Sequence, residues 1–99
     1  MNFTRTDEGE ATTLAISGSL DALSTPDLRS AIESLVADRR KSVTVDVSAL
    51  RLIDSSGVGA IVSLYKRIRA IGGKVVVRGL RDQPLAIFKL LRLDKVLVG

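Results

Sequence analysis

The chain has 99 residues, of which 45% are hydrophobic and 26% are charged, and its net charge at pH 7 is +4. This length and balance predict one globular domain over residues 1–99. The chain contains no cysteine and no histidine, which excludes disulfides, thiolate chemistry, a Ser-His-Asp triad and the commonest metal ligand. No apolar run approaches the roughly 20 residues that cross a bilayer, and the N-terminus has no apolar signal core, so we expect a cytoplasmic protein without membrane insertion.

The first forty residues predict two strands and a helix. Residues 3–6 and 12–17 favour strands joined by a polar connection, and Gly18 is expected to end the second strand. The helix is expected to start in the segment 24–27, where hydroxyl groups precede a proline and an acid. Apolar residues then recur at helical spacing until the cations of residues 39–41, which suit the negative end of a helix.

The rest of the chain alternates strands and helices. The predicted segments are a strand at 42–47, a helix from the serines at 55 and 56 to about residue 70 or 71, a strand at 74–78, a helix at 82–91 and a last short strand at 95–98. Asp82 is expected to cap the third helix, with Pro84 in its first turn. The order β-β-α-β-α-β-α-β predicts an α/β fold, with a mixed sheet of about five strands packed against three helices.

The segment Ile53–Gly59 places a carboxylate and two hydroxyls between a strand and a helix. Free backbone N–H groups and the positive end of the helix dipole meet there, so the position suits an anion. A serine that carries a phosphate there is a candidate switch, whereas the alternative is that a serine only caps the helix. Gly57 and Gly59 have two interpretations, close packing of this turn on the sheet or an approach path for a partner.

Other polar residues have structural and functional interpretations. Asp46 lies mid-strand, where a buried, hydrogen-bonded acid that holds a neighbouring loop is expected. Asp21 is weighed equally as a loop cap and as a partner contact. Five basic residues have two interpretations: a positive patch that binds an acidic partner or anionic lipid, or ordinary solvent-exposed faces. They are Arg51, Lys66, Arg67, Arg69 and Lys74. With three aromatic residues and no RNA-binding motif, direct nucleic acid binding is not expected.

The element order and three segments resemble the STAS domain in its bacterial anti-sigma factor antagonist form. The segments are Gly18–Asp21, which matches a G-x-L-D motif, Val45–Gly59 with its D-S-S-G, and Gly72–Val77. The resemblance covers nearly the whole chain and implies a single STAS-like domain. Many relatives continue into a last amphipathic helix, whose absence here is expected to expose part of the sheet or to matter little.

The resemblance implies a regulatory binding module without catalytic residues, metal or cofactor. By position, Ser55 would be phosphorylated by a partner anti-sigma factor serine kinase, which the unphosphorylated protein binds to release a sigma factor. A metal-dependent, PP2C-type phosphatase would reset it. The implied partner surface comprises Asp21, Asp54, Ser55, Ser56, Gly57 and Val58.

Alternative functions use the same domain differently. A STAS subunit would dock on a membrane lipid-transport ATPase complex through the same helix end without modification, and a stress-sensing scaffold would assemble into larger particles. Homodimer formation is left open. An enzyme is a remote option, because a serine nucleophile needs a base that only a lysine with a lowered pKa would supply here.

Overall fold

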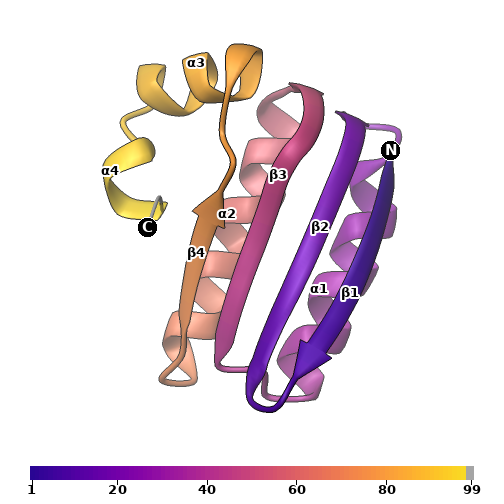
Figure 1. Ribbon diagram of the computed structural model, residues 1–99, viewed down its shortest axis with the longest axis vertical. Coiled ribbons are helices and arrows are strands. Elements are labelled where there is room, and N and C mark those ends of the chain that lie inside the picture. The colour runs from indigo at the N-terminus through magenta and orange to yellow at the C-terminus, as the bar shows by residue number, and fades with distance from the viewer. Residues whose placement is uncertain (98–99) are drawn as a thin grey trace.

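A mixed four-stranded sheet organises the chain in the computed structural model, which describes residues 1–97 (Figure 1). Its strands, in spatial as well as chain order, are β1 (Asn2–Glu8), β2 (Ala11–Leu20), β3 (Ser42–Ile53) and β4 (Lys74–Arg78). The helices are α1 (Thr25–Ala37), α2 (Ser55–Ala70), α3 (Asp82–Leu90) and α4 (Asp94–Leu97). β1 and β2 form an antiparallel hairpin, whereas β2, β3 and β4 run parallel to one another. The α/β class and the mixed sheet are as predicted.

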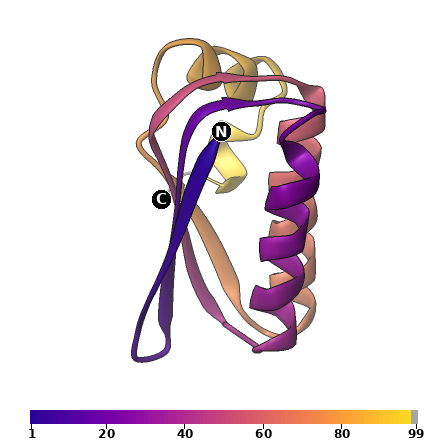
Figure 2. The ribbon, with the colours of Figure 1, turned by 90° about the vertical axis from the view of Figure 1, so that its right-hand side faces the viewer.

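The two long helices cover one face of the sheet (Figure 2). Alternation along β3 turns Val43, Val45 and Val47 toward them, and each is at most 2% exposed. Leu64 and Ile68 of α2 lie in the same core, and full burial of each such side chain contributes roughly 1.5–3 kcal/mol. The core therefore fixes α2 against the sheet along its length.

The C-terminal segment corrects the predicted strand count, because residues 94–97 form α4 rather than a fifth strand. The backbone N–H groups of Val96 and Leu97 both donate to the carbonyl of Leu93, so the segment closes a helical turn. Leu97 is 2% exposed and belongs to the core. A short apolar run does not distinguish strand from helix by periodicity. Residue 98 of the predicted strand lies outside the described residues.

The sequence predicted that β2 ends at Gly18, because glycine is a poor strand former, but the strand does not end there. The strand runs on to Leu20 through a register shift next to Gly18, which adopts φ +83°. Glycine adopts this left-handed conformation without steric cost, so it absorbs the irregularity and the pairing with β3 continues. β3 is also longer than predicted, because β2 pairs with it as far as Ile53.

Helix ends differ from the predicted ones in three places. Ser24 occupies the N-cap position of α1, but its side chain makes no cap hydrogen bond. α1 ends at Ala37, before the basic residues, since Arg39 turns into the left-handed region at φ 53°. Asp82 is the first residue of α3 rather than its cap, and the N-cap position belongs to Arg81. Within residues 1–97, no helix has the length and apolar character to cross a membrane.

Candidate functional site

The carboxyl ends of β2 and β3 lie side by side, and α2 begins directly after β3. Leu20 is the register partner of Ile53, and the N–H of Asp54 donates to the carbonyl of Leu20 at 3.1 Å. This pairing brings the two acids that follow the strands, Asp21 and Asp54, to the same edge of the sheet. In parallel sheets this edge is where binding sites form.

The side chain of Asp54 caps α2. Its backbone is extended, and its Oδ1 accepts the N–H of Gly57 at 3.1 Å, while its carbonyl accepts the N–H of Val58 at 3.0 Å. The alternative in which one of the two serines caps the helix is therefore wrong. Asp54 satisfies a donor that would otherwise be free and places a negative charge at the positive end of the dipole.

The hydroxyl of Ser55 is not needed as a cap, because Asp54 fills that role. Ser55 is the first residue of α2 and is exposed, whereas Ser56 is half-buried. Among the described residues, neither hydroxyl has a hydrogen bond within the protein. Because Gly57 is bound to the cap, the N–H groups of Ser55 and Ser56 are the helix-start donors that remain for an anion. Gly57 and Val58, also expected at the partner surface, are buried.

The two glycines of this turn have different reasons to be glycine. A Cβ on Gly57 would stand 2.7 Å from Cγ1 of Ile53 and 2.8 Å from Cγ of Leu20, so close packing on the sheet requires glycine there. A Cβ on Gly59 would meet only an Arg29 guanidinium nitrogen at 3.9 Å. Packing therefore explains Gly57 and does not explain Gly59.

Asp21 organises the loop between β2 and α1. Its Oδ1 accepts the N–H groups of Leu23 at 3.0 Å and Ser24 at 3.1 Å. The hydroxyl of Ser24 accepts the N–H of Asp21 at 3.0 Å, which explains why it does not cap α1. The Ser24 N–H, more than any other group, holds the pKa of the Asp21 carboxyl below its ordinary value, so this acid is charged at neutral pH. The loop-capping interpretation of Asp21 is thus observed, and its partner contact stays a prediction.

Two exposed leucines near the serines were not singled out from the sequence. Leu23 is 92% exposed in the loop after Asp21, and Leu52 is 55% exposed one residue before the end of β3. Leu52 also lines a shallow hollow between the strand ends, together with Ser19, Leu20, Asp21, Ile53, Asp54 and Gln83. The strict alternation of buried and exposed residues in β3 ends before this point, and Arg51 and Leu52 are both exposed.

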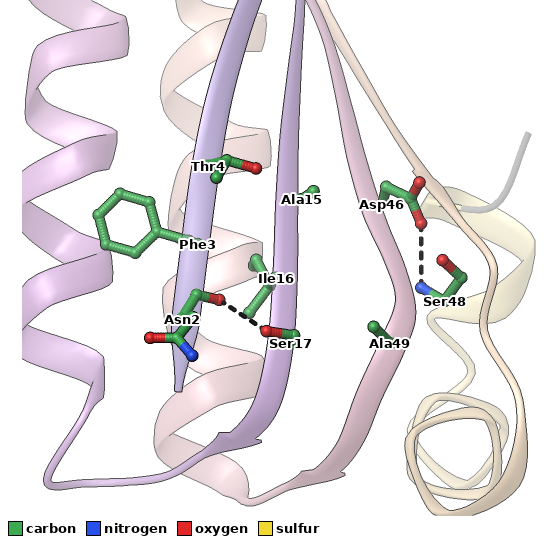
Figure 3. A pocket seen from close by; sticks show the side chains of 9 residues that line it. All are labelled: Asn2, Phe3, Thr4, Ala15, Ile16, Ser17, Asp46, Ser48 and Ala49. Atoms are coloured by element: carbon green, nitrogen blue, oxygen red, sulfur yellow. Dashed lines mark hydrogen bonds between the residues drawn. The ribbon is translucent and has the colours of Figure 1, made fainter.

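Asp46 lies further along the sheet and has a structural role. Its Oδ1 accepts the N–H of Ser48 at 3.0 Å, and its Oδ2 lies 3.6 Å from Nη2 of Arg78 on β4. The expected hydrogen-bonded acid is therefore present, but it is half-buried within β3 and ties the strand to β4. A nearby hollow lies around Ala15 and Ala49, and its lining combines small and polar residues with Phe3 and Ile16 (Figure 3). The Ser48 N–H donates to Asp46 at this hollow, and none of the residues that line it belongs to the segment 53–59.

The five basic residues do not gather into one patch. Arg67 forms a two-point ion pair with Glu33 of α1. Lys74 begins β4 opposite Ser42 at the start of β3, whereas Arg51 lies near the other end of that strand. The described residues also contain no group of three or more acids that could hold a metal ion.

This geometry defines a small α/β binding domain, which presents two strand ends and an acid-capped helix start at one edge. A family model described as "Mlab, STAS domain" matches residues 3–99. The chain therefore belongs to the STAS domain family, which confirms the resemblance found in the sequence.

Named relatives come from curated proteins and solved structures. The anti-sigma-B factor antagonists of Listeria monocytogenes and Listeria innocua are each 24% identical over 82 residues, 83% of this chain and 72% of theirs. An anti-sigma factor antagonist from Mycobacterium paratuberculosis has a similar structure, with a TM-score of 0.83 and 26% identity over 96% of this chain and 80% of that one. The Bacillus cell fate determinant SpoIIAA in its phosphorylated form has a TM-score of 0.81 and 18% identity over 99% of this chain and 89% of that one. Antagonists of this kind are regulatory binding proteins, not enzymes.

Proposed function

We propose that this protein is an anti-sigma factor antagonist that is switched off by phosphorylation of Ser55. In this proposal the unphosphorylated form binds a partner anti-sigma serine kinase and frees a sigma factor, and a PP2C-type phosphatase restores it. The names of the relatives support the class. The observation that carries the site assignment is the exposed, uncommitted hydroxyl of Ser55 at the first residue of α2.

A phosphate on Ser55 would alter the surface more than the fold. It adds about −1.5 to −2 charge, which the two free N–H groups and the helix dipole favour. Asp54 and Asp21 repel it, so the two effects on stability oppose each other. The same charge would lie at the same end of the sheet as exposed Leu23 and Leu52, and a partner that covers this end would have to desolvate it. The modification is therefore expected to weaken partner binding by adding charge to the contact surface.

The site assignment is tested by phosphorylating the purified protein. The wild-type chain, Ser55→Ala and Ser56→Ala are each incubated with ATP and the candidate serine kinases of the native genome, and phosphate is mapped by mass spectrometry. We expect modification at Ser55 of the wild type and of Ser56→Ala, and none in Ser55→Ala. Phosphate on another residue, or none with any kinase, would contradict the proposal.

A second test separates the regulatory role from a structural one. Ser55→Asp is expected to weaken binding to the kinase by about tenfold or more, since it places charge at the contact surface. Because the residue is exposed, we expect the melting temperature to stay within about 3 °C of the wild type. A large loss of stability with unchanged affinity would support a structural role instead.

A STAS subunit that docks on a membrane lipid-transport ATPase is the second candidate. This candidate needs no modification of the surface, because Asp54 caps α2 without a phosphate. Intact mass of the protein from its native host and identification of the proteins bound to it distinguish the two. Stable unmodified Ser55 with a bound ATPase supports the second candidate.

A further inference from the structure

The edge of β3 that faces β4 loses its strand partner well before the strand ends. β4 pairs only with residues 42–46 of β3, and Arg78 is its last residue, opposite Asp46. The chain then leaves the sheet at Gly79, where φ is +84° and a Cβ would stand 2.8 Å from Cβ of Ser48. The last seven residues of β3, 47–53, therefore continue with only β2 as a paired strand.

A single side chain replaces the missing strand at the end of β3. The N–H of Ile53 donates to Oε1 of Gln83 at 2.9 Å, and the carbonyl of Ile53 accepts from Nε2 of Gln83 at 2.8 Å. Both backbone groups of one residue are thus paired with one amide, as a neighbouring strand would pair them. Gln83 belongs to the first turn of α3, which is anchored in the core by buried Pro84 and by Phe88, 0% exposed.

The same contact fixes the peptide that precedes the functional site. The Ile53–Asp54 peptide is held at both ends, because its carbonyl bonds to Gln83 and its N–H bonds to the carbonyl of Leu20. Asp54 then caps α2, and Ser55 follows. Gln83 therefore fixes the peptide next to the Asp54–Ser55 peptide, and through it the orientation of the Ser55 hydroxyl.

We propose that Gln83 is the positioning residue for Ser55, and that α3 controls through it how the hydroxyl is presented to a kinase. Its consequence for phosphate transfer rests on the proposed function, whereas its effect on the Ile53–Asp54 peptide does not. A movement of α3 would release this peptide and change the presentation of Ser55.

Glutamine is the side chain that this geometry requires. Glutamate has the same length and still accepts the Ile53 N–H, but its carboxylate cannot donate to the Ile53 carbonyl and sets oxygen against oxygen. Alanine removes both contacts. Gln83→Glu therefore isolates the bond that holds the Ile53–Asp54 peptide, and Lys89→Ala, an exposed change on the same helix, serves as the control.

The first measurement is amide hydrogen exchange by NMR on the wild type and these three variants. We expect the Asp54 amide to exchange about fivefold to tenfold faster in Gln83→Ala and Gln83→Glu, with Leu64 in the core of α2 and the Lys89→Ala control unchanged. Unchanged exchange at Asp54 in both Gln83 variants would overturn the proposal. An equal rise at Leu64 would also overturn it, because it would mean a general loss of stability.

The second measurement is the rate of phosphate transfer from the kinase that modifies the wild type. We expect kcat for both Gln83 variants to fall about tenfold with KM nearly unchanged, because positioning matters in the transfer step rather than in docking. A rise in KM alone would overturn the control of phosphate transfer by Gln83. If no kinase modifies the wild type, the proposed function fails, and the exchange measurement still decides whether Gln83 positions this peptide.

Discussion

Replacing Gly59 with alanine should stabilise this protein, whereas the same replacement at Gly57 should destabilise it. Both glycines lie in α2, where glycine is about 0.8–1 kcal/mol less favourable than alanine in a helix interior. A methyl group on Gly59 meets only a flexible guanidinium at 3.9 Å, so this gain is retained. For a domain of about 100 residues, 1 kcal/mol raises the melting temperature by roughly 5 °C.

The methyl group on Gly57 instead enters the packed end of the sheet. It would lie 2.7 Å from Cγ1 of Ile53 and 2.8 Å from Cγ of Leu20, and these side chains are only 3% and 0% exposed. Overpacking of this kind costs about 1–3 kcal/mol and exceeds the smaller helix gain at the third residue of α2. A net destabilisation of about 1–2 kcal/mol is therefore expected for Gly57→Ala.

Thermal and urea unfolding of the two variants and the wild type measure both effects. Equal shifts in the same direction would refute the reasoning, because the two positions differ mainly in what surrounds a new methyl group. The more stable Gly59→Ala variant also tests why glycine stands there. If it binds the kinase less well, the interpretation of Gly59 as an approach path for a partner gains support. If binding is unchanged, that interpretation fails.

Two further predictions concern polar contacts away from the site. Arg40→Ala should lower stability by about 2 kcal/mol in urea unfolding, and Arg40→Lys should not restore it. The reason is that the guanidinium donates to Thr12 Oγ1 and the Gly9 carbonyl at 2.7 Å each and to the Ala11 carbonyl at 3.0 Å. The hydrogen bond from the Ser48 N–H is the main cause that lowers the pKa of the Asp46 carboxyl below 3.8 in the folded protein. The charged carboxylate therefore stabilises the fold above that pH, and this stabilisation is lost as the pH falls through the lower folded pKa. Asp46→Asn should therefore lose less stability than the wild type between neutral pH and pH values below 3.8, and equal losses would contradict this assignment.

Periodicity predicted the elements whose burial is regular. The alternating valines of β3 and the helical spacing in α2 are consequences of one buried face. α2 lies where it was expected, and β3 begins where it was expected but runs on to Ile53, beyond the alternating valines. The segment 95–98 has no such period over a useful length, and there the choice between strand and helix was decided by local bonds to Leu93. Gly18 was misjudged because a glycine can end a strand or carry a bulge within it, and only the partner strand decides between these outcomes.

The position of the site was predictable, but the contacts that hold it were not. A strand followed by hydroxyls and a helix predicts an anion-compatible helix start from local sequence alone. Gln83, by contrast, lies 30 residues from Ile53 along the chain, and no local pattern announces a side chain that pairs with a distant backbone. The exposure of Leu23 is likewise a property of the folded loop, because its backbone N–H and that of Ser24 donate to Asp21 while its side chain stays exposed.

The choice of cap matters for the proposed switch. Serine and aspartate are both good caps, so the sequence could not tell which of three adjacent residues would accept the helix N–H group. A serine cap would use its oxygen as an acceptor and turn the hydroxyl back toward the helix. With Asp54 as the cap, the helix start is stable and Ser55 keeps its oxygen free for an incoming phosphoryl group. In the proposed switch, the acid would thus leave the adjacent hydroxyl available, and its negative charge would oppose the favourable effect of the helix dipole on a phosphate at Ser55.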